Sequence, residues 1–142
     1  MYKFLEQTAE TYMTRDVRTV TRDVNLLELS EKFEQDDFNA YPVEEDGQVV
    51  GIVTKFDVLK CFALTPTQMI PRYADLMSRT IGDVMTPEFI YVHPDTRLTR
   101  VLQLMVEHRL RSIIVLDSTQ RLAGIIARED VVAALKATAR DD

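Results

Sequence analysis

The spacing of apolar residues predicts the same succession of elements twice along the chain. Each copy opens with a short extended piece, over residues 18–21 and again over residues 90–93, and each piece ends at a turn. Apolar residues then recur at the spacing of one helix face, and they are Leu26, Leu29 and Phe33 in the first copy and Leu98, Val101, Leu102 and Met105 in the second. The pattern therefore predicts an amphipathic helix after each extended piece.

Two short apolar strands and a second helix complete each copy. The strands are expected over residues 40–43 and 49–53 in the first copy, and over residues 112–116 and 122–126 in the second. The polar residues between them, 45–48 and 117–120, are typical of hairpin turns. Pro42 interrupts a strand pattern, which places it at an edge, a strand start or a bulge. The closing helices begin near Thr54 and Ala127, so each copy is strand–helix–strand–strand–helix, a small α/β (α+β) layer.

The two copies also align residue by residue. Met13-Thr14 falls on Met85-Thr86 at an offset of 72 (85 − 13), and Asp57 falls on Asp130 after one residue is inserted in the second copy. A fixed internal period defines the building unit of a fold. A copy of about fifty residues buries its apolar faces poorly by itself. We therefore expect the two sheets to pack together around a pseudo-two-fold axis, with each copy supplying half of a cleft.

This alignment divides the chain into five segments. We predict a leading helix over residues 1–12, a first repeat over 13–62, a connector over 63–80, a second repeat over 81–138 and a tail over 139–142. The connector contains Pro66 and Pro71, which are typical of a link between elements, and a helical turn or two is expected near residues 72–78.

Composition narrows the classes of function. The net charge of −6 disfavours non-specific binding to nucleic acid, and the longest apolar runs are far too short to span a membrane. A single cysteine, Cys61, excludes an internal disulfide and, with no signal segment at the start of the chain, favours a cytoplasmic location. His93 and His108 lack the spacing of metal ligands, and no catalytic group of residues is recognisable. We therefore expect a protein that is not an enzyme and holds no metal or cofactor.

The sharpest local motif is the run Gly51-Ile52-Val53-Thr54-Lys55-Phe56-Asp57 at the start of a predicted helix. One interpretation is a nucleotide site, since the helix N–H groups and Thr54 suit a phosphate, Asp57 suits ribose hydroxyls and Gly51 lets a flat ring approach. The other interpretation is a capping box, which the Thr-x-x-Asp spacing by itself favours. Ala127 replaces the hydroxyl residue in the second copy, so only the first copy carries the whole motif.

Taken together, these motifs resemble the cystathionine β-synthase (CBS) domain. The order is Met-Thr, a Val in an extended piece, a helix, Tyr41-Pro42-Val43, and then Gly51-Ile52-Val53-Thr54 followed by Asp57. Two such domains in tandem resemble a CBS pair, or Bateman module, and the resemblance covers nearly the whole chain. It implies two βαββα repeats packed sheet to sheet. It also implies an adenosine ligand (AMP, ADP, ATP or S-adenosylmethionine) in the cleft, regulation of a partner protein, and a homodimer.

The resemblance also implies which residues bind the ligand. Asp57 would hold the ribose and Thr54 would contact phosphate, while Lys55 and, from the other repeat, Arg111 are the candidate basic residues. The base pocket would be lined by Thr19, Val20, Asn39, Ala40, Tyr41 and Pro42. A second, weaker site would hold Tyr91, Val92, Ile113, Ala127 and Asp130. Because Ile114 and Ala127 depart from the pattern in the second copy, the two sites are expected to be unequal.

Two functions of different classes follow. The leading hypothesis is a stand-alone regulatory module that binds an adenosine ligand and signals to an unknown partner protein. The alternative is a protein-interaction or dimerisation module whose nucleotide site has decayed. Neither involves nucleic acid or a membrane.

Overall fold

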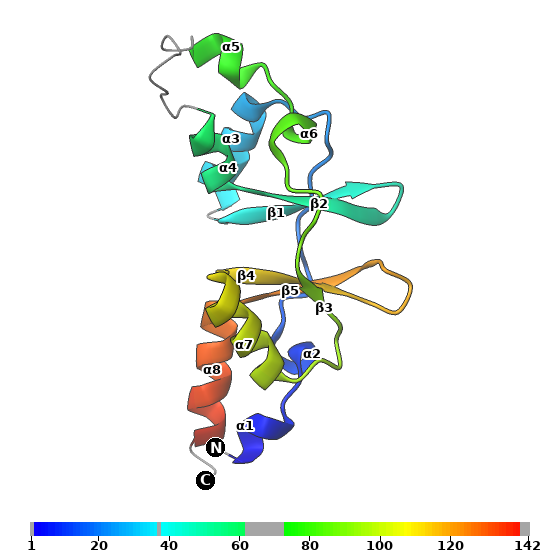
Figure 1. Ribbon diagram of the computed structural model, residues 1–142, viewed down its shortest axis with the longest axis vertical. Helices are drawn as coiled ribbons and strands as arrows, with labels where there is room; N and C mark the ends of the chain where they lie inside the picture. Colours follow the sequence, from blue (N-terminus) through cyan, green and yellow to red (C-terminus); the bar gives the residue numbers. More distant parts are fainter. Residues whose placement is uncertain (1, 37, 62–72, 140–142) are drawn as a thin grey trace. The chain divides into compact units, whose positions relative to one another are not determined.

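The computed structural model describes residues 2–36, 38–61 and 73–139 (Figure 1). Contacts between residues divide the chain into two compact units. Unit 1 comprises Met1–Val17 and Ile90–Asp142, and unit 2 comprises Arg18–Phe89. The start of the chain therefore packs with the second repeat and not with the first, which it precedes in sequence.

Unit 2 is built on an antiparallel hairpin covered by helices. Its elements are α3 (Leu26–Asp36), β1 (Ala40–Glu45), β2 (Gln48–Thr54), α4 (Lys55–Lys60), α5 (Tyr73–Met77) and α6 (Ile81–Val84). The two turn residues, Asp46 and Gly47, both have positive φ (53° and 81°), as the common two-residue hairpin turn requires. The predicted turn over 45–48 is thus confirmed.

Unit 1 has the same plan with one strand more. Its elements are α1 (Tyr2–Glu6), α2 (Ala9–Tyr12), β3 (Tyr91–Val92), α7 (Leu98–His108), β4 (Ser112–Leu116), β5 (Leu122–Ala127) and α8 (Arg128–Ala139). The strands are ordered β3-β4-β5, with β3 parallel and β5 antiparallel to β4. The mixed α+β fold predicted from the sequence is confirmed.

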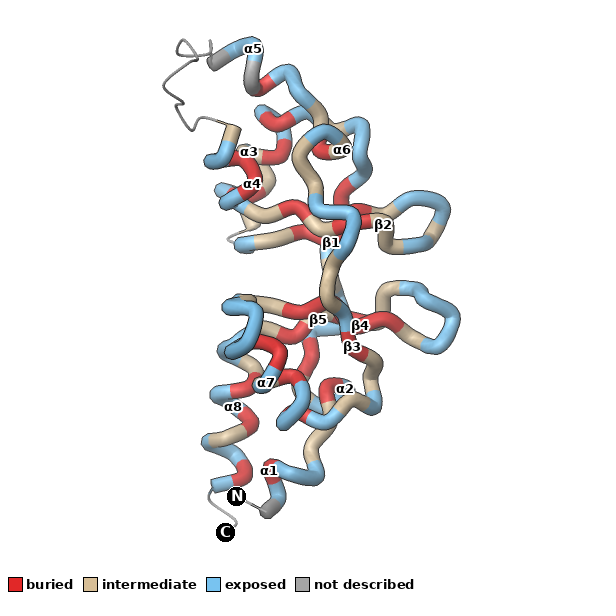
Figure 2. The backbone as a smooth tube through the Cα atoms, viewed as in Figure 1, coloured by how far each residue is buried: buried red, intermediate tan, exposed pale blue. Residues whose placement is uncertain are grey.

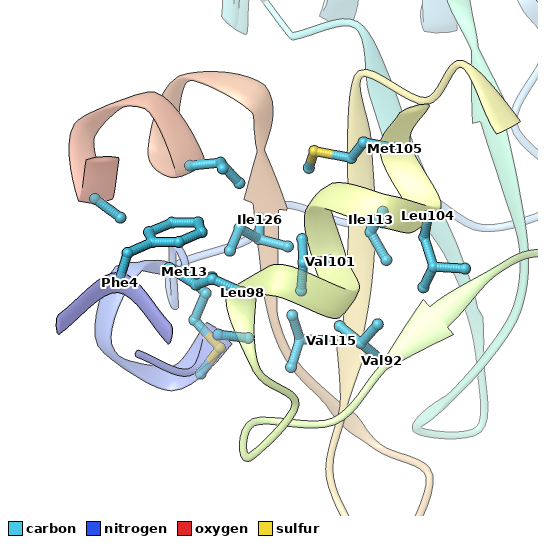
Figure 3. Packing of buried hydrophobic residues seen from close by; sticks show 13 residues of the cluster. Phe4, Met13, Val92, Leu98, Val101, Leu104, Met105, Ile113, Val115 and Ile126 are labelled. Carbon is cyan, nitrogen blue, oxygen red and sulfur yellow. The ribbon is translucent and has the colours of Figure 1, made fainter. Parts of the chain in front are cut away.

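Each unit has its own apolar core, and the helix stripes predicted from the sequence belong to it or pack against it. Figure 2 shows buried residues in both units. Leu26, Leu29 and Phe33 of α3 are buried in unit 2. In unit 1, Phe4 and Met13 from the start of the chain lie with the residues of α7 and the sheet (Figure 3).

The predicted single helix over residues 1–12 is wrong, because two short helices are separated at Gln7 and Thr8. The backbone there bonds to residues around the start of α7. The Leu98 N–H donates to Gln7 O (3.0 Å) and the Ala9 N–H donates to Thr96 O (2.9 Å). These long-range bonds replace the i to i−4 bonds that a continuous helix needs. Residues 62–72, which include the first part of the connector, lie outside the described part of the chain. The α5 helix confirms the helical turn expected near 72–78.

The two Met-Thr segments serve as matching edge pieces. Thr14 exchanges two backbone hydrogen bonds with Ile125 (2.8 and 2.9 Å) in unit 1, and Thr86 exchanges two with Ile52 (2.9 and 3.0 Å) in unit 2. Each Met-Thr segment therefore lies in one repeat by sequence but pairs with a strand of the other repeat.

This arrangement explains the glycine of each second strand. A Cβ on Gly51 would lie 2.9 Å from Thr86 O, and one on Gly124 would lie 2.6 Å from Thr14 O. The expectation that Gly51 makes room for a flat ring is wrong, because the Thr86 carbonyl oxygen and the Met85 side chain already occupy that space.

Candidate functional site

Three of the predicted ligand residues, Thr54, Lys55 and Asp57, lie at the junction of β2 and α4. The strand ends at Thr54, whose extended backbone (φ −118°, ψ 164°) makes it the N-cap of α4. The Asp57 N–H donates to Thr54 Oγ1 (3.2 Å), and the Thr54 N–H donates to Asp57 Oδ2 (2.8 Å). Both bonds of a capping box are therefore present, which confirms the structural interpretation of the Thr-x-x-Asp spacing.

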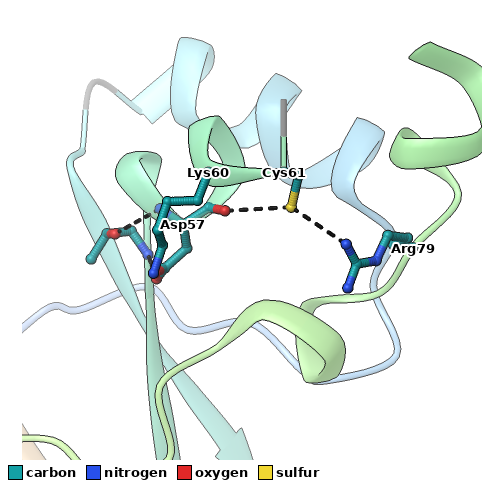
Figure 4. Close-up of polar contacts among 5 residues, drawn as sticks. Asp57, Lys60, Cys61 and Arg79 are labelled. Atoms are coloured by element: carbon teal, nitrogen blue, oxygen red, sulfur yellow. Dashed lines mark hydrogen bonds and ion pairs between the residues drawn. The ribbon is translucent and has the colours of Figure 1, made fainter. Parts of the chain in front are cut away.

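The Asp57 carboxylate is almost fully buried, at 5% exposure. Its second oxygen, Oδ1, lies 3.1 Å from the ammonium nitrogen of Lys60, one turn further along α4 (Figure 4). Because Lys60 is largely exposed, this pair adds little to stability. A carboxylate oxygen can accept more than one hydrogen bond. Asp57 thus has a structural role and one oxygen that also faces an exposed cation.

Cys61 closes the same short helix. Its thiol donates to Asp57 O (3.5 Å), and Nη1 of Arg79 lies 3.9 Å from the sulfur (Figure 4). The thiol is bonded back to the helix, as expected of a packed cysteine.

The predicted base-pocket segment runs beside β1. The Val20 N–H donates to Pro42 O (3.1 Å), and the Glu44 N–H donates to Val20 O (2.9 Å). Val20 and Val43 form only an isolated bridge. Pro42 has no N–H to extend the pairing toward residue 19. It lies in β1, an edge strand of the two-stranded sheet, which is one of the three positions that the sequence allowed. Thr19 and Val20 therefore lie along the edge of β1 without forming a regular strand.

Tyr41 is a core residue rather than a pocket wall. Its side chain is 1% exposed and packs against the Phe33 ring, with the ring centroids 4.9 Å apart. Its hydroxyl lies within donating distance of Lys32 O (2.9 Å) and Asp36 Oδ2 (2.7 Å), and burial raises the pKa of that hydroxyl well above its ordinary value. Only the backbone of Tyr41 is left for a ligand.

Two residues missed from the sequence hold this region together. Asp36, at the end of α3, accepts from Arg18 Nη1 through Oδ1 (2.6 Å) and faces the Tyr41 hydroxyl through Oδ2. Arg18 directly precedes the Thr19-Val20 segment, so Asp36 ties that segment to β1. No spacing in the sequence signals a pair eighteen residues apart.

Asn39, Ala40 and Lys55 meet at the end of the hairpin. The Lys55 N–H donates to Asn39 O (3.0 Å), and Ala40 pairs with Thr54 across the two strands. The Lys55 ammonium lies 5.9 Å from the centroid of the Phe33 ring. All the first-site residues except Arg111, which belongs to unit 1, are thus carried by unit 2. The approach of Arg111 to this site stays a prediction.

The matching junction in unit 1 is incomplete. The Ala127 N–H donates to Asp130 Oδ2 (2.7 Å), but alanine offers no oxygen to the Asp130 N–H. Burial raises the pKa of the Asp130 carboxyl. The Arg128 N–H donates to Arg111 O (3.0 Å), the counterpart of the Lys55–Asn39 bond. One of the two bonds of a capping box is therefore present in unit 1, and the neighbouring backbone hydrogen bond matches the one in unit 2.

The other second-site residues differ in how far they reach the surface. Tyr91 is exposed on β3 and its ring lies edge-on to His93, with the centroids 5.7 Å apart. Val92 and Ile113 are buried in the core. Among the described residues, no three His, Cys, Asp or Glu side chains group as metal ligands, and no helix is long and apolar enough to cross a membrane.

A family model for the CBS domain matches residues 9–64 and 81–137. The chain belongs to the CBS domain family. The tandem pair inferred from the internal repeat is therefore confirmed, since the two matched segments correspond to its two copies.

Known relatives of this CBS pair include longer proteins. The chain is 29% identical over 145 residues to the chloroplastic CBS domain-containing protein CBSX1 of Arabidopsis thaliana, with 87% of this chain and 61% of CBSX1 covered. It is 27% identical over 122 residues to the homoserine O-acetyltransferase of Methanosarcina acetivorans, with 85% of this chain and 20% of that protein covered. The chain thus spans only part of the length of these relatives.

A solved structure of similar length has the same fold. The crystal structure of CBSX2 in complex with AMP matches with a TM-score of 0.77 and 25% identity, covering 92% of this chain and 98% of the CBSX2 chain. CBSX2 is a CBS-pair protein from Arabidopsis thaliana.

Proposed function

We propose that this CBS pair is a regulatory module that binds an adenosine ligand, AMP, ADP, ATP or S-adenosylmethionine, at the site carried by unit 2. The observation that carries the proposal is the junction of β2 and α4. It brings a hydroxyl, a carboxylate and a lysine next to the open edge formed by Thr19-Val20 and β1. The AMP complex of the similar CBSX2 supports an adenosine ligand.

The proposed roles follow from the chemistry of each group. Asp57 Oδ1 accepts from ribose hydroxyls, in competition with Lys60, and the backbone of residues 39–42 with Thr19 and Val20 borders the base. Lys55 and Thr54 lie at the helix start, where an anion is favoured. Arg111 is proposed as a further phosphate contact on the strength of the family resemblance alone.

Calorimetric titration with AMP, ATP and S-adenosylmethionine tests the proposal. We expect saturable heat with at least one of them. Asp57→Asn keeps an oxygen for the Thr54 N–H but removes the charge, and should weaken binding by about tenfold. Asp130→Asn is the matched control in unit 1 and should change the affinity less. Tight binding that is lost in Asp130→Asn and untouched in Asp57→Asn would refute the ranking of the sites.

Arg111 is tested by comparing AMP with adenosine. Arg111→Ala should lower the affinity for AMP and leave that for adenosine unchanged, because the side chain is assigned to phosphate. Arg121→Ala, at an exposed hairpin position of the same unit, is the control. Equal losses for both ligands would argue against a phosphate contact.

A second candidate function is favoured by the capping box itself. The Thr54 and Asp57 side chains each accept from the backbone N–H of the other residue, so their presence is explained without a ligand. A protein-interaction or dimerisation module with a decayed site would give no heat with any of the three compounds. In either case we propose self-association, an unidentified regulated protein and a cytoplasmic location, with no catalysis and no nucleic-acid partner.

A further inference from the structure

The segments that run beside the first hairpin strand are held differently in the two units. In unit 1, β3 forms a regular parallel ladder with β4. In unit 2, Val20 forms only an isolated bridge with Val43 of β1. Thr19 and Val20, which are proposed to border the base, therefore depend on something besides a regular backbone ladder for their position.

A side-chain ion pair supplies a second tie in unit 2. Arg18 directly precedes Thr19, and its Nη1 lies 2.6 Å from Oδ1 of Asp36, the last residue of α3. The Arg18 side chain is 69% exposed, whereas that of Asp36 is 12% exposed. The pair thus joins an arginine that solvent can reach to a carboxylate fixed at the edge of the core.

The Asp36 carboxylate is oriented in turn by Tyr41 of β1. The Tyr41 hydroxyl lies 2.7 Å from Oδ2 of Asp36, and the tyrosine ring is buried against Phe33. An ionised carboxylate only accepts hydrogen bonds, so the guanidinium and the hydroxyl each have a separate oxygen to donate to. The two contacts of Asp36 therefore connect the Thr19-Val20 segment, α3 and β1.

The matching positions of unit 1 are unable to form these contacts. At the offset of 72 residues, the arginine, the aspartate and the tyrosine fall on Ile90, His108 and Ile113. The two isoleucines carry no polar side-chain atom, and both pack in the core of unit 1. The side-chain tie is therefore found in the unit whose backbone pairing is irregular, and its counterpart is replaced by apolar packing in the unit with the regular ladder.

We propose that Arg18 and Asp36 are positioning residues for the ligand site of unit 2. Their ion pair holds Thr19 and Val20 along β1, in the place where they border the base. The inference rests on the proposed function and adds a control of that same site. A ligand binds only those molecules in which the segment is in place, so loosening the pair lowers the apparent affinity in proportion. Because Arg18 is exposed, salt screens the pair, and the affinity for even an uncharged ligand then depends on ionic strength.

Calorimetric titration with adenosine tests the coupling, because adenosine has no charge for Arg18 to attract directly. Arg18→Met keeps the aliphatic stem, and Asp36→Asn keeps an oxygen for the Tyr41 hydroxyl. Each should weaken binding by about fivefold, and the double variant should lose no more than either single variant, since all three remove the same pair. Arg18→Lys should restore most of the affinity. Arg22→Met is the matched control, because it removes a pair with Glu45 in which both side chains are about half exposed, and it should change the affinity by less than about twofold.

Salt and amide hydrogen exchange separate positioning from direct contact with the ligand. The ratio of the wild-type affinity to that of Arg18→Met should fall from about fivefold to below about twofold between about 0.05 and 1 M sodium chloride. The N–H groups of Val20 and Glu44, which bond between the segment and β1, should exchange faster in Arg18→Met. The Ile52 N–H, which bonds to Thr86 on the other side of the hairpin, should exchange at the wild-type rate.

The possible results distinguish this inference from the proposed function. Weaker binding without faster exchange at Val20 and Glu44 would mean that Arg18 acts on the ligand itself, which overturns the positioning role. Equal binding of adenosine by the wild type and Arg18→Met would refute the coupling and leave the proposed function intact. A wild type that binds neither adenosine nor AMP, ATP or S-adenosylmethionine would refute the proposed function and the coupling with it.

Discussion

The first turns of α4 and α8 share one backbone plan and hold different side chains. In both, the residue after the strand donates to the chain that enters the preceding hairpin, Lys55 to Asn39 and Arg128 to Arg111. In both, an aspartate three residues after the N-cap accepts the N-cap N–H (2.8 Å at Asp57 and 2.7 Å at Asp130). Only unit 2 adds the hydroxyl.

This comparison separates what the fold needs from what function can use. The aspartate caps the helix in both copies, so its presence alone is no evidence for a ligand. The features that differ are the Thr54 hydroxyl and Pro42, and both lie in unit 2. The difference between the copies, rather than their shared residues, is therefore our reason for proposing the site in unit 2.

The segments beside β1 and β4 differ for a related reason. Ile114 pairs with Tyr91 in a parallel ladder two residues long, whereas Pro42 leaves only the Val20–Val43 bridge. One missing N–H thus opens the edge in unit 2 next to the residues proposed to bind the ligand.

The largest expected effect on stability comes from placing the proline of unit 2 at the matching position of unit 1. Ile114→Pro removes an N–H from the central strand of the three-stranded sheet, where the residue is fully buried, and should cost about 3 kcal/mol or more. The reciprocal Pro42→Ile restores an N–H at an edge and should change stability by less than about 1 kcal/mol. Urea unfolding of both variants tests this asymmetry. Equal losses would mean that the proline does not explain the shorter pairing in unit 2.

A smaller effect is expected from exchanging the caps. Thr54→Ala should lower the free energy of unfolding by about 1 kcal/mol, because the Asp57 N–H loses its acceptor. Ala127→Thr should raise it by a similar amount if the new hydroxyl reaches the Asp130 N–H. Thermal and urea unfolding of the two single variants measure both changes. A loss at Thr54 without a gain at Ala127 would show that the two junctions differ in more than the side chain.

Much of the fold was predictable because its signals are local. The helix stripes at Leu26 and Leu98, the hairpin turn at Asp46-Gly47 and the start of α4 at Thr54 each depend on neighbouring residues. The internal repeat then identified the family. The capping box was also predictable, since its two partners are three residues apart.

The features that were missed depend on contacts between distant segments. The break at Gln7 is caused by bonds to Thr96 and Leu98, and the space at Gly51 is filled by Met85-Thr86. The Arg18–Asp36–Tyr41 contacts join three elements through side chains whose types are common on any surface. Periodicity in the sequence carries no information about such pairs.

The smallest expected effect concerns the charge of the incomplete cap. Burial, with a contribution from Glu129, raises the pKa of Asp130 above its ordinary value of 3.8. The folded state therefore binds the proton more tightly than the unfolded chain does, and the stabilisation is full below pH 3.8 and is lost as the pH rises through the raised pKa. Relative to Asp130→Asn, the wild type should thus lose stability over the pH range just above 3.8. Urea unfolding at several pH values measures this difference.

Glu129→Gln should keep most of the pH dependence, because burial is the larger cause. Parallel pH profiles for the wild type and Asp130→Asn would show that the incomplete cap leaves the carboxylate as well solvated as in the unfolded chain.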